Sequence, residues 1–314
     1  MTYCRETAAA EPLAGTSPYR KVWLVIEQPG AWGEDALLDS ALPAGFGRDL
    51  KEQVDDPEIS VMLARRPAMQ SVERRATNRR RLWLAHTSPF GVRMRAGSLD
   101  NVKDLLRWDW QAIKRGELPP VGRRSADPAL FICTNGKRDA CCAVAGRKVI
   151  DDLREDPELT GQVFELSHLG GHRFAPTALM LPWGYLYGRL TPADARTALN
   201  LAWTGKTLTS HLRGRSSLPQ WAQIAEIAVR EASGIHAVDS FDVLVGRAGR
   251  WLPASMATSP LPDDSLQVRH TDGRAWDVEL EPLDIAPRSV SCGEPLTAGS
   301  TWRASRVEPG ARWS

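Results

Sequence analysis

Four side chains near the middle of the sequence could hold a metal centre. Cys133 and Cys142 have eight residues between them, and His168 and His172 form a His-x3-His pair about 25 residues later. Thiolates and imidazoles are the usual protein ligands of iron and zinc. The residue types and their spacing therefore predict a metal site, in which Cys141 is an alternative to its neighbour Cys142.

Several nearby residues suit a negatively charged group at this site. Asp139 can cap a helix that begins directly after it, and Cys142 would then lie in the first turn, where free N–H groups favour negative charge. Arg138 adds a positive charge. Gly170 and Gly171 allow the backbone to approach a bulky inorganic group, and they indicate a loop rather than a helix between the two histidines. We expect that loop at the surface, and we expect Arg138, Gly170 and Gly171 to contact the cofactor.

Three other interpretations of these residues remain open. A structural zinc site is the first, although such sites usually separate two cysteines by only two to four residues. A thiol redox site is the second, although the adjacent Cys141 and Cys142 are not a Cys-x-x-Cys motif. In the third, the cysteines are core residues and the histidines bond to the backbone. Cys292 stands alone in the sequence and is expected to be a small buried hydrophobic residue.

Composition excludes some classes of protein. The chain has 314 residues, a net charge of +2 and 25% charged residues, so nothing indicates a strong affinity for nucleic acid or membrane. The first 15 residues lack the order of a signal peptide, and no apolar run is long enough to span a membrane. Five cysteines without a disulfide framework suit a reducing compartment, so we expect a cytoplasmic protein. One basic run, interpreted as a solvated loop or a binding patch for an acidic partner, comprises Arg74, Arg75, Arg79, Arg80 and Arg81.

Hydrophobic periodicity predicts an α/β chain whose element order occurs twice. Residues 1–20 are interpreted as a loose leader. The first block has strands at 21–28, 59–66 and 80–87 and helices at 33–42, 45–54 and 99–116. After a linker at 117–128, the second block has strands at 128–133, 162–167, 177–182 and 185–190 and helices at 140–156 and 191–203. The start of the last helix is marked by Thr191 as N-cap and by Asp194 three residues later.

The remaining sequence predicts one more helix and a small β module. The helix covers 217–234 and ends at a glycine. From residue 236 onward, short alternating segments predict an antiparallel sheet. The predicted domains are an N-terminal α/β domain at 1–120, a central domain at 121–235 and the β module at 236–314.

The central residues also resemble a known fold. Residues 131–202 resemble a thioredoxin-like 2Fe–2S ferredoxin, in which one Cys follows the first strand and a second begins the first helix. Over most of residues 20–235 the chain is similar to the sucrase/ferredoxin-like family, through CTNGKRDACC, HLGGH-x-FAP and HLRGRS. The resemblance implies a thioredoxin-like ferredoxin domain, preceded by a degenerate copy and followed by the β module. It favours Cys142 over Cys141 and implies a cis Ala175–Pro176 bond.

The same resemblance implies a function. It suggests one 2Fe–2S cluster bound by Cys133, Cys142, His168 and His172, in an electron-transfer or redox-responsive protein with a partner that is itself a redox protein. Two imidazoles in place of thiolates should raise the reduction potential above that of an all-Cys ferredoxin, and electron transfer could be coupled to a proton. An electron carrier is favoured over an enzyme. No glycosidase is expected, because no paired-carboxylate motif is found. The alternatives are a zinc-stabilised interaction module and a thiol oxidoreductase.

Overall fold

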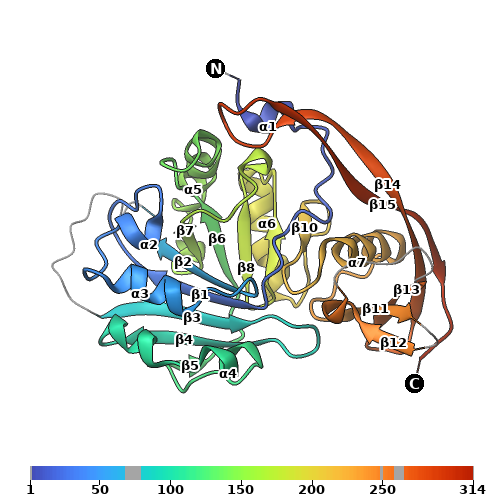
Figure 1. Cartoon of the computed structure of the whole chain (residues 1–314), viewed down its shortest axis with the longest axis horizontal. Helices are drawn as coiled ribbons and strands as arrows, with labels where there is room; N and C mark the ends of the chain where they lie inside the picture. The colour runs from blue at the N-terminus through green and yellow to red at the C-terminus, as the bar shows by residue number, and fades with distance from the viewer. Residues whose placement is uncertain (1, 68–78, 248–249, 258–264, 314) are drawn as a thin grey trace.

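Backbone pairing divides the strands that the structure describes into two sheets (Figure 1). The structure is a computed structural model of the chain, and it describes residues 2–67, 79–247, 250–257 and 265–313. The larger sheet is mixed, with the strand order β10-β9-β8-β6-β7-β2-β1-β3-β4-β5. Its strands are β1 (Val22–Glu27), β2 (Ile59–Arg65), β3 (Arg80–His86), β4 (Arg93–Leu99), β5 (Arg123–Arg124), β6 (Ala129–Cys133), β7 (Val163–Leu166), β8 (Ala178–Leu181), β9 (Tyr185–Tyr187) and β10 (Leu212–Arg215).

One pairing pattern occurs twice in the large sheet. β1 is parallel to β2 and antiparallel to β3, which pairs antiparallel with β4. β6 is likewise parallel to β7 and antiparallel to β8, which pairs antiparallel with β9. The two halves join where β2 meets β7 in antiparallel register, with Ala64 opposite Leu166. The repeated element order of the sequence thus corresponds to a repeated strand topology within one sheet.

The central strands of the large sheet are buried on both faces. In β6, Leu130 and Ile132 pack toward the helices after β6 and β9, whereas Phe131 and Cys133 face the opposite side. On that side the Trp83 ring of β3 lies 5.1 Å from the Phe131 ring, between centroids. Four strand spacings in a flat sheet would put β3 and β6 about 19 Å apart, so this contact requires a strongly curled sheet. Burial on both faces explains why β1, β6 and β8 are nearly continuous apolar runs.

Short helices connect the strands. They are α1 (Cys4–Thr7), α2 (Ala36–Asp39), α3 (Phe46–Gln53), η1 (Val102–Arg107), α4 (Trp110–Lys114), η2 (Cys142–Gly146), α5 (Arg147–Leu153), η3 (Pro157–Leu159), η4 (His172–Phe174), α6 (Pro192–Trp203), α7 (Gln220–Ser233) and η5 (Ala254–Met256). The prediction of a single helix at 99–116 is wrong, because two helices occupy this range. The helical run breaks at Trp108, which is extended, and Asp109 caps a new helix by accepting the Ala112 N–H (2.9 Å).

Other predicted features are confirmed. Thr191 and Asp194 form the capping box at the start of α6, and Gly234 ends α7 in a left-handed conformation. Asp139 accepts the backbone N–H of Cys141 (2.8 Å), as a residue that caps the following helix should. The Ala175–Pro176 peptide bond is cis, and so is Leu181–Pro182.

The second sheet is the predicted antiparallel β module, with one unexpected extension. Its order is β12-β11-β13-β14-β15, formed by β11 (Phe241–Arg247), β12 (Arg250–Pro253), β13 (Ser265–His270), β14 (Ala275–Ser289) and β15 (Leu296–Pro309). β14 and β15 pair from Trp276–Pro309 as far as Ser289–Leu296. As Figure 1 shows, this long ribbon runs beyond the module and reaches α1.

The N-terminal segment is packed, and the prediction of a loose leader is wrong. Cys4 of α1 is fully buried, and so is nearly all of Glu11. The Glu11 carboxylate accepts two hydrogen bonds from Arg173 (2.8 and 2.9 Å) and two from Arg288 of β14 (2.9 and 3.2 Å). Ser289 N–H donates to Thr7 Oγ1 (3.0 Å). These contacts clamp the N-terminal segment between the ribbon and the middle of the chain.

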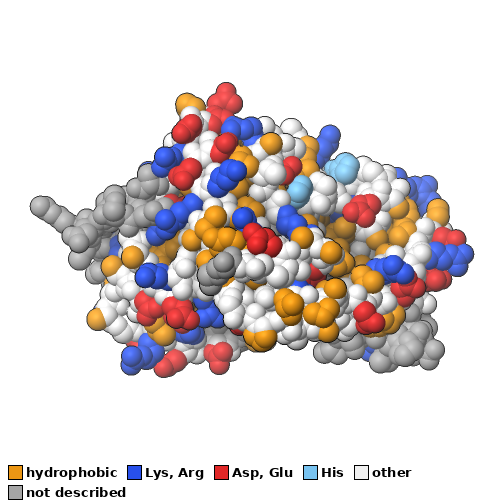
Figure 2. All heavy atoms as spheres, turned by 90° about the horizontal axis from the view of Figure 1, so that it is seen from above, with side chains coloured by type: hydrophobic (Ala, Val, Ile, Leu, Met, Phe, Trp, Pro, Cys, Tyr) orange, Lys and Arg blue, Asp and Glu red, His pale blue; other side chains and the backbone are white. Residues whose placement is uncertain are grey.

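The described surface carries charges of both signs. Figure 2 shows acidic and basic side chains interspersed on the face drawn, in keeping with the net charge of +2. Of the predicted basic run, Arg74 and Arg75 lie outside the described residues, while Arg80 Nε donates to Gln28 Oε1 (3.0 Å) and Arg81 stacks 4.5 Å from the Trp83 ring. Within the described ranges, the helices are too short and too polar to cross a membrane.

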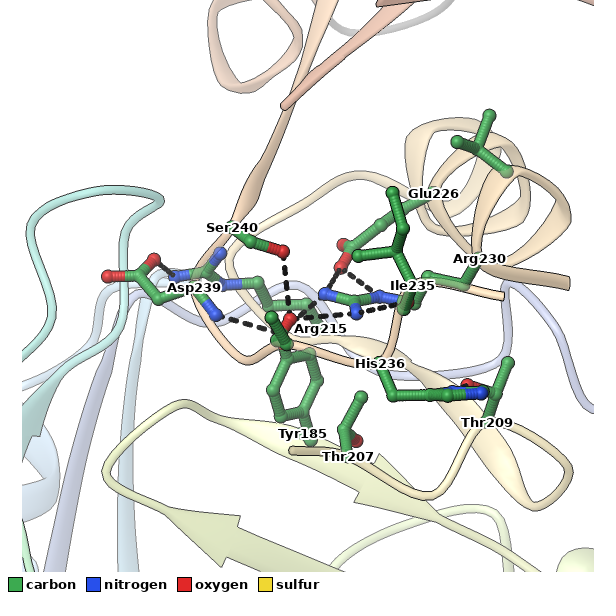
Figure 3. A network of polar contacts seen from close by, with 12 residues as sticks. Tyr185, Thr207, Thr209, Arg215, Glu226, Arg230, Ile235, His236, Asp239 and Ser240 are labelled. Carbon is green, nitrogen blue, oxygen red and sulfur yellow. Dashed lines mark hydrogen bonds and ion pairs between the residues drawn. The ribbon is translucent and has the colours of Figure 1, made fainter. Parts of the chain in front are cut away.

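Buried polar contacts fix α7 to the large sheet (Figure 3). Arg230 of α7 pairs with Glu226 one turn earlier (2.8 Å) and donates to the hydroxyl of Tyr185 in β9 (3.0 Å). Arg215 of β10 pairs with Asp239 (2.5 Å), and the N–H of Asp239 donates to the same Tyr185 hydroxyl (3.4 Å). The segment that leads from α7 into the β module is therefore held against β9 and β10.

We predict that Arg230→Ala lowers the free energy of unfolding by about 3–5 kcal/mol, because it leaves the Glu226 carboxylate buried without a counter-charge. Urea unfolding followed by tryptophan fluorescence measures the loss. Arg303→Ala is the control, since its ion pair with Glu281 (2.6 Å) is exposed and should contribute less than about 1 kcal/mol. Equal, small losses in both variants would contradict the prediction.

Candidate metal centre

The first part of the site lies at the end of β6. Cys133 is the last residue of that strand, and Cys142 lies in the helix that begins after Asp139. Gly146, one turn beyond Cys142, lets this helix come close, because a Cβ there would lie 2.1 Å from the Cys133 carbonyl oxygen. Both thiols are buried. The Cys142 thiol donates to the Cys133 sulfur, which lowers the pKa of Cys133 and raises that of Cys142.

The two predicted histidines meet the cysteines from the neighbouring strand. His168 follows β7, and His172 begins the short turn η4. The centroids of the two imidazole rings lie 5.3 Å apart. The nearby imidazole of His168 helps to lower the pKa of Cys133, as do the backbone N–H groups of Asn135 and Leu169. The fold thus gathers the four residues that the sequence spacing had singled out.

The donor atoms of these residues suit a metal. Nδ1 of His168 and Nδ1 of His172 are both buried, and neither has a hydrogen-bond partner among the described residues. A buried nitrogen without a partner is costly in an apolar setting. Bonds from both nitrogens to a metal would satisfy them. Two thiols and two imidazole nitrogens match the donor types that bind iron or zinc.

The outer nitrogen of His172 is held from two sides. Its Nε2 lies 2.8 Å from Ser291 Oγ at the tip of the β14–β15 ribbon, and 3.7 Å from Asp139 Oδ2. Such partners orient a histidine so that its other nitrogen can face a metal. Burial lowers the pKa of His172 and so favours the neutral imidazole. The expected surface position is wrong for His172, which is 8% exposed, because the ribbon covers it.

His168 lies closer to the solvent. It is half-buried and lines a cleft of about 540 Å³ together with Arg138, Glu34 and Asp35. Arg138 pairs with Glu34 (3.0 Å) in a largely exposed contact. The predicted role of Arg138 beside a cofactor stays a prediction.

The two glycines between the histidines make room for an arginine. Gly171 has a φ of 71°, and a Cβ there would lie 2.4 Å from Arg213 Nη2. Arg213 is buried and donates to the Gly170 carbonyl (3.1 Å). The guanidinium group of Arg213 thus holds the loop between His168 and His172 in place. A contact of either glycine with a cofactor stays a prediction.

A second group of ligand-type side chains escaped the sequence analysis. Cys4 Sγ lies 3.4 Å from Cys141 Sγ, Cys141 Sγ lies 3.3 Å from Cys292 Sγ, and Cys4 and Cys292 are 3.6 Å apart. Asp139 Oδ1 lies 3.3 Å from Cys292 Sγ, and the donor atoms of all four residues fall within 4.8 Å of one another. The expectation that Cys292 is isolated is wrong, because the β14–β15 ribbon places its sulfur next to that of Cys141.

Hydrogen bonds fix the carboxylate of this second group. Asp139 accepts N–H donors from Cys141 (2.8 Å) and Cys292 (2.9 Å), one on each oxygen. Burial alone would raise the pKa of the Asp139 carboxyl, but these two donors hold it below its ordinary value. Burial raises the pKa of Cys4 and raises that of Cys141 to about 11. Without a metal, both side chains are therefore protonated thiols at neutral pH.

Little in the sequence could have revealed this second group. Its cysteines come from residues 4, 141 and 292, so no short motif contains them. The available signal was the number of cysteines: the chain has five, and the predicted site used only two of them.

Comparison with known protein families finds one match. A family model described as sucrase/ferredoxin-like matches residues 13–214, a range that contains Cys133, Cys142, His168 and His172. Cys4 and Cys292 lie outside that range. The chain matches no curated protein and no solved structure. Since the matched range covers more than half of the chain, the protein belongs to the sucrase/ferredoxin-like family.

Proposed function

We propose that this protein carries one 2Fe–2S cluster on Cys133, Cys142, His168 and His172 and serves as an electron carrier or redox-responsive protein. The observation that carries the proposal is the buried, unpartnered Nδ1 on each of the two histidines, next to two buried thiols. Membership of the family supports it. The cluster would supply one-electron transfer.

The chain's own residues would bind and tune the group. The N–H groups of Asn135 and Leu169 point to the Cys133 sulfur, and hydrogen bonds to ligand sulfurs are one determinant of an iron–sulfur potential. Neutral imidazoles bring less negative charge than thiolates do. For this reason we expect a potential above that of all-Cys clusters, as in Rieske centres.

We further propose that residues 121–235 form a thioredoxin-like ferredoxin domain and residues 1–120 a degenerate copy of it. The support is the strand pairing β7-β6-β8-β9, repeated as β2-β1-β3-β4. The N-terminal copy has the same strand order but lacks the four proposed cluster ligands. At the end of β1, in the place that Cys133 has in β6, stands Glu27.

A redox partner would reach the site most directly at the cleft beside His168. This proposed ligand lines the cleft, whereas His172 is covered by the ribbon. Glu34 and Asp35 at the rim, with Arg138, would meet complementary charges on a partner protein. A zinc-bound interaction module and a thiol oxidoreductase are the alternatives that the following experiments exclude or support.

We predict that anaerobically purified protein is brown, with two irons and two sulfides per chain. Cys142→Ser should lose the iron and the visible absorption, because it removes a ligand. Cys141→Ser should keep both, since the Cys141 thiol faces Cys4 and Cys292 instead. Iron, sulfide and absorption are measured on both variants. A colourless Cys141→Ser protein beside a brown Cys142→Ser protein would show that the wrong thiol was chosen, and a colourless zinc protein would support the alternative.

We predict that Ser291→Ala keeps the cluster but raises its reduction potential. Bound through Nδ1, His172 would donate its Nε2–H to Ser291 Oγ, and loss of that acceptor makes the imidazole a weaker electron donor. A tenfold effect on relative affinity corresponds to about 59 mV for one electron. Redox titration measures the shift. Ser289→Ala is the control, because among the described residues its hydroxyl bonds only to the Glu294 carbonyl (2.9 Å). Identical potentials in the two variants would contradict the assignment.

A further inference from the structure

Three thiols from distant parts of the chain meet beside the proposed cluster site without belonging to it. Cys4 comes from α1, Cys141 from the helix after Asp139, and Cys292 from the tip of the β14–β15 ribbon. Each sulfur lies within 3.6 Å of the other two. None of the three is in a disulfide.

We propose that Cys4, Cys141, Cys292 and Asp139 bind a single Zn²⁺ ion, at a structural site separate from the ligands Cys133, Cys142, His168 and His172. The proposal stands whether or not those four residues bind a 2Fe–2S cluster.

The spacing of the sulfurs fits one shared ion. Thiolates about 2.3 Å from zinc at tetrahedral angles lie about 3.8 Å from one another. The observed separations of 3.3, 3.4 and 3.6 Å need only a small outward movement to reach that value. A 2Fe–2S cluster has room for only two protein ligands on each iron, so it would place at least one of the three thiolates on the second iron and hold that sulfur further from the others.

The donor set also fits zinc. Three thiolates and one carboxylate are a tetrahedral, sulfur-rich set of the kind that zinc prefers. Asp139 Oδ1 is already turned to the thiols, at 3.3 Å from Cys292 Sγ and 4.0 Å from Cys4 Sγ. Four protein ligands would leave no open position, and Cys4 and Cys141 are fully buried. Both features are typical of a structural site rather than a catalytic one.

Backbone N–H groups around the site would stabilise the negative charge of a thiolate and of the carboxylate. The backbone N–H of Arg5 donates to the Cys141 sulfur, and the N–H groups of Cys141 and Cys292 hold the Asp139 carboxylate in place. Binding would convert three thiols to thiolates and release three protons to solvent, with no change of oxidation state. Cys4 and Cys292 lie outside the residues that match the family model, whereas Asp139 and Cys141 lie inside them, so the proposed site combines ligands from both parts of the chain.

Such an ion would link Cys4 and Cys292, from the two terminal parts of the chain, to Asp139 and Cys141 in its middle. The ribbon tip that carries Cys292 also carries Ser291, which bonds to His172. A Zn²⁺ ion on Cys292 would therefore hold Ser291 in position as well.

Metal analysis of the full chain tests the proposal. Protein is produced in medium with added zinc, and its metals are measured by mass spectrometry after purification without chelators. We expect one zinc per chain in the wild type and in Cys133→Ser, which lacks a proposed cluster ligand. We expect at least a tenfold loss of zinc in Cys292→Ser and in Cys4→Ser. Retention of zinc in both of these variants would overturn the assignment.

A second measurement leaves all four proposed zinc ligands unchanged. Co²⁺ is titrated into reduced, metal-free Cys133→Ser/Cys142→Ser protein, in which the neighbouring thiols are absent. We expect one equivalent to bind with the intense visible bands of tetrahedral Co²⁺ and the thiolate charge-transfer bands in the ultraviolet, and Zn²⁺ to displace it. No thiolate bands, a disulfide among the three cysteines in protein isolated under reducing conditions, or a third iron per chain in place of zinc would each overturn the proposal.

Discussion

The buried carboxylate of Glu11 holds together the three segments that enclose both candidate metal sites. It lies between the guanidinium groups of Arg173 and Arg288, and these lower its pKa despite its burial. Removal of one partner of such a buried pair costs about 3–5 kcal/mol, because it leaves an uncompensated charge. Arg173 directly follows His172, and Arg288 lies four residues before Cys292. One carboxylate thus holds the N-terminal segment, the histidine loop and the ribbon tip together.

A second buried ion pair fixes the other side of the site. Arg65 of β2 donates to Glu165 of β7 (2.8 Å) where the two halves of the large sheet join, and Thr134 donates to the same carboxylate oxygen (2.7 Å). Thr134 directly follows Cys133. The junction between the halves therefore positions the end of β6. This gives the N-terminal half, which provides none of the four proposed cluster ligands, a structural part in the site.

The sequence predicted local features well and long-range ones poorly. The apolar runs of β1 and β6, the capping box at Thr191 and the cap at Asp139 were predictable, because each depends on residues within a few positions of one another. The ribbon was not, since alternation in β14 and β15 predicts strands without indicating how far they extend past the module. Burial of Cys4 and the partners of Cys292 depend on that extension. The four residues of the first site share one supersecondary unit, whereas the second group requires both chain ends.

The adjacent cysteines on one helical turn point to two different groups of side chains. Successive residues of an α-helix point about 100° apart, so Cys142 faces Cys133 while Cys141 faces Cys4 and Cys292. The π-helical turn at Cys142–Gly146 lies at this point, in keeping with the frequent occurrence of such turns at functional sites. Asp139 contacts both sides, at 3.7 Å from His172 Nε2 and 3.3 Å from Cys292 Sγ. The two thiols therefore face separate groups of side chains and share Asp139 as a neighbour. A fragment limited to the middle of the chain would keep the four proposed cluster ligands but lose Ser291, which bonds to His172.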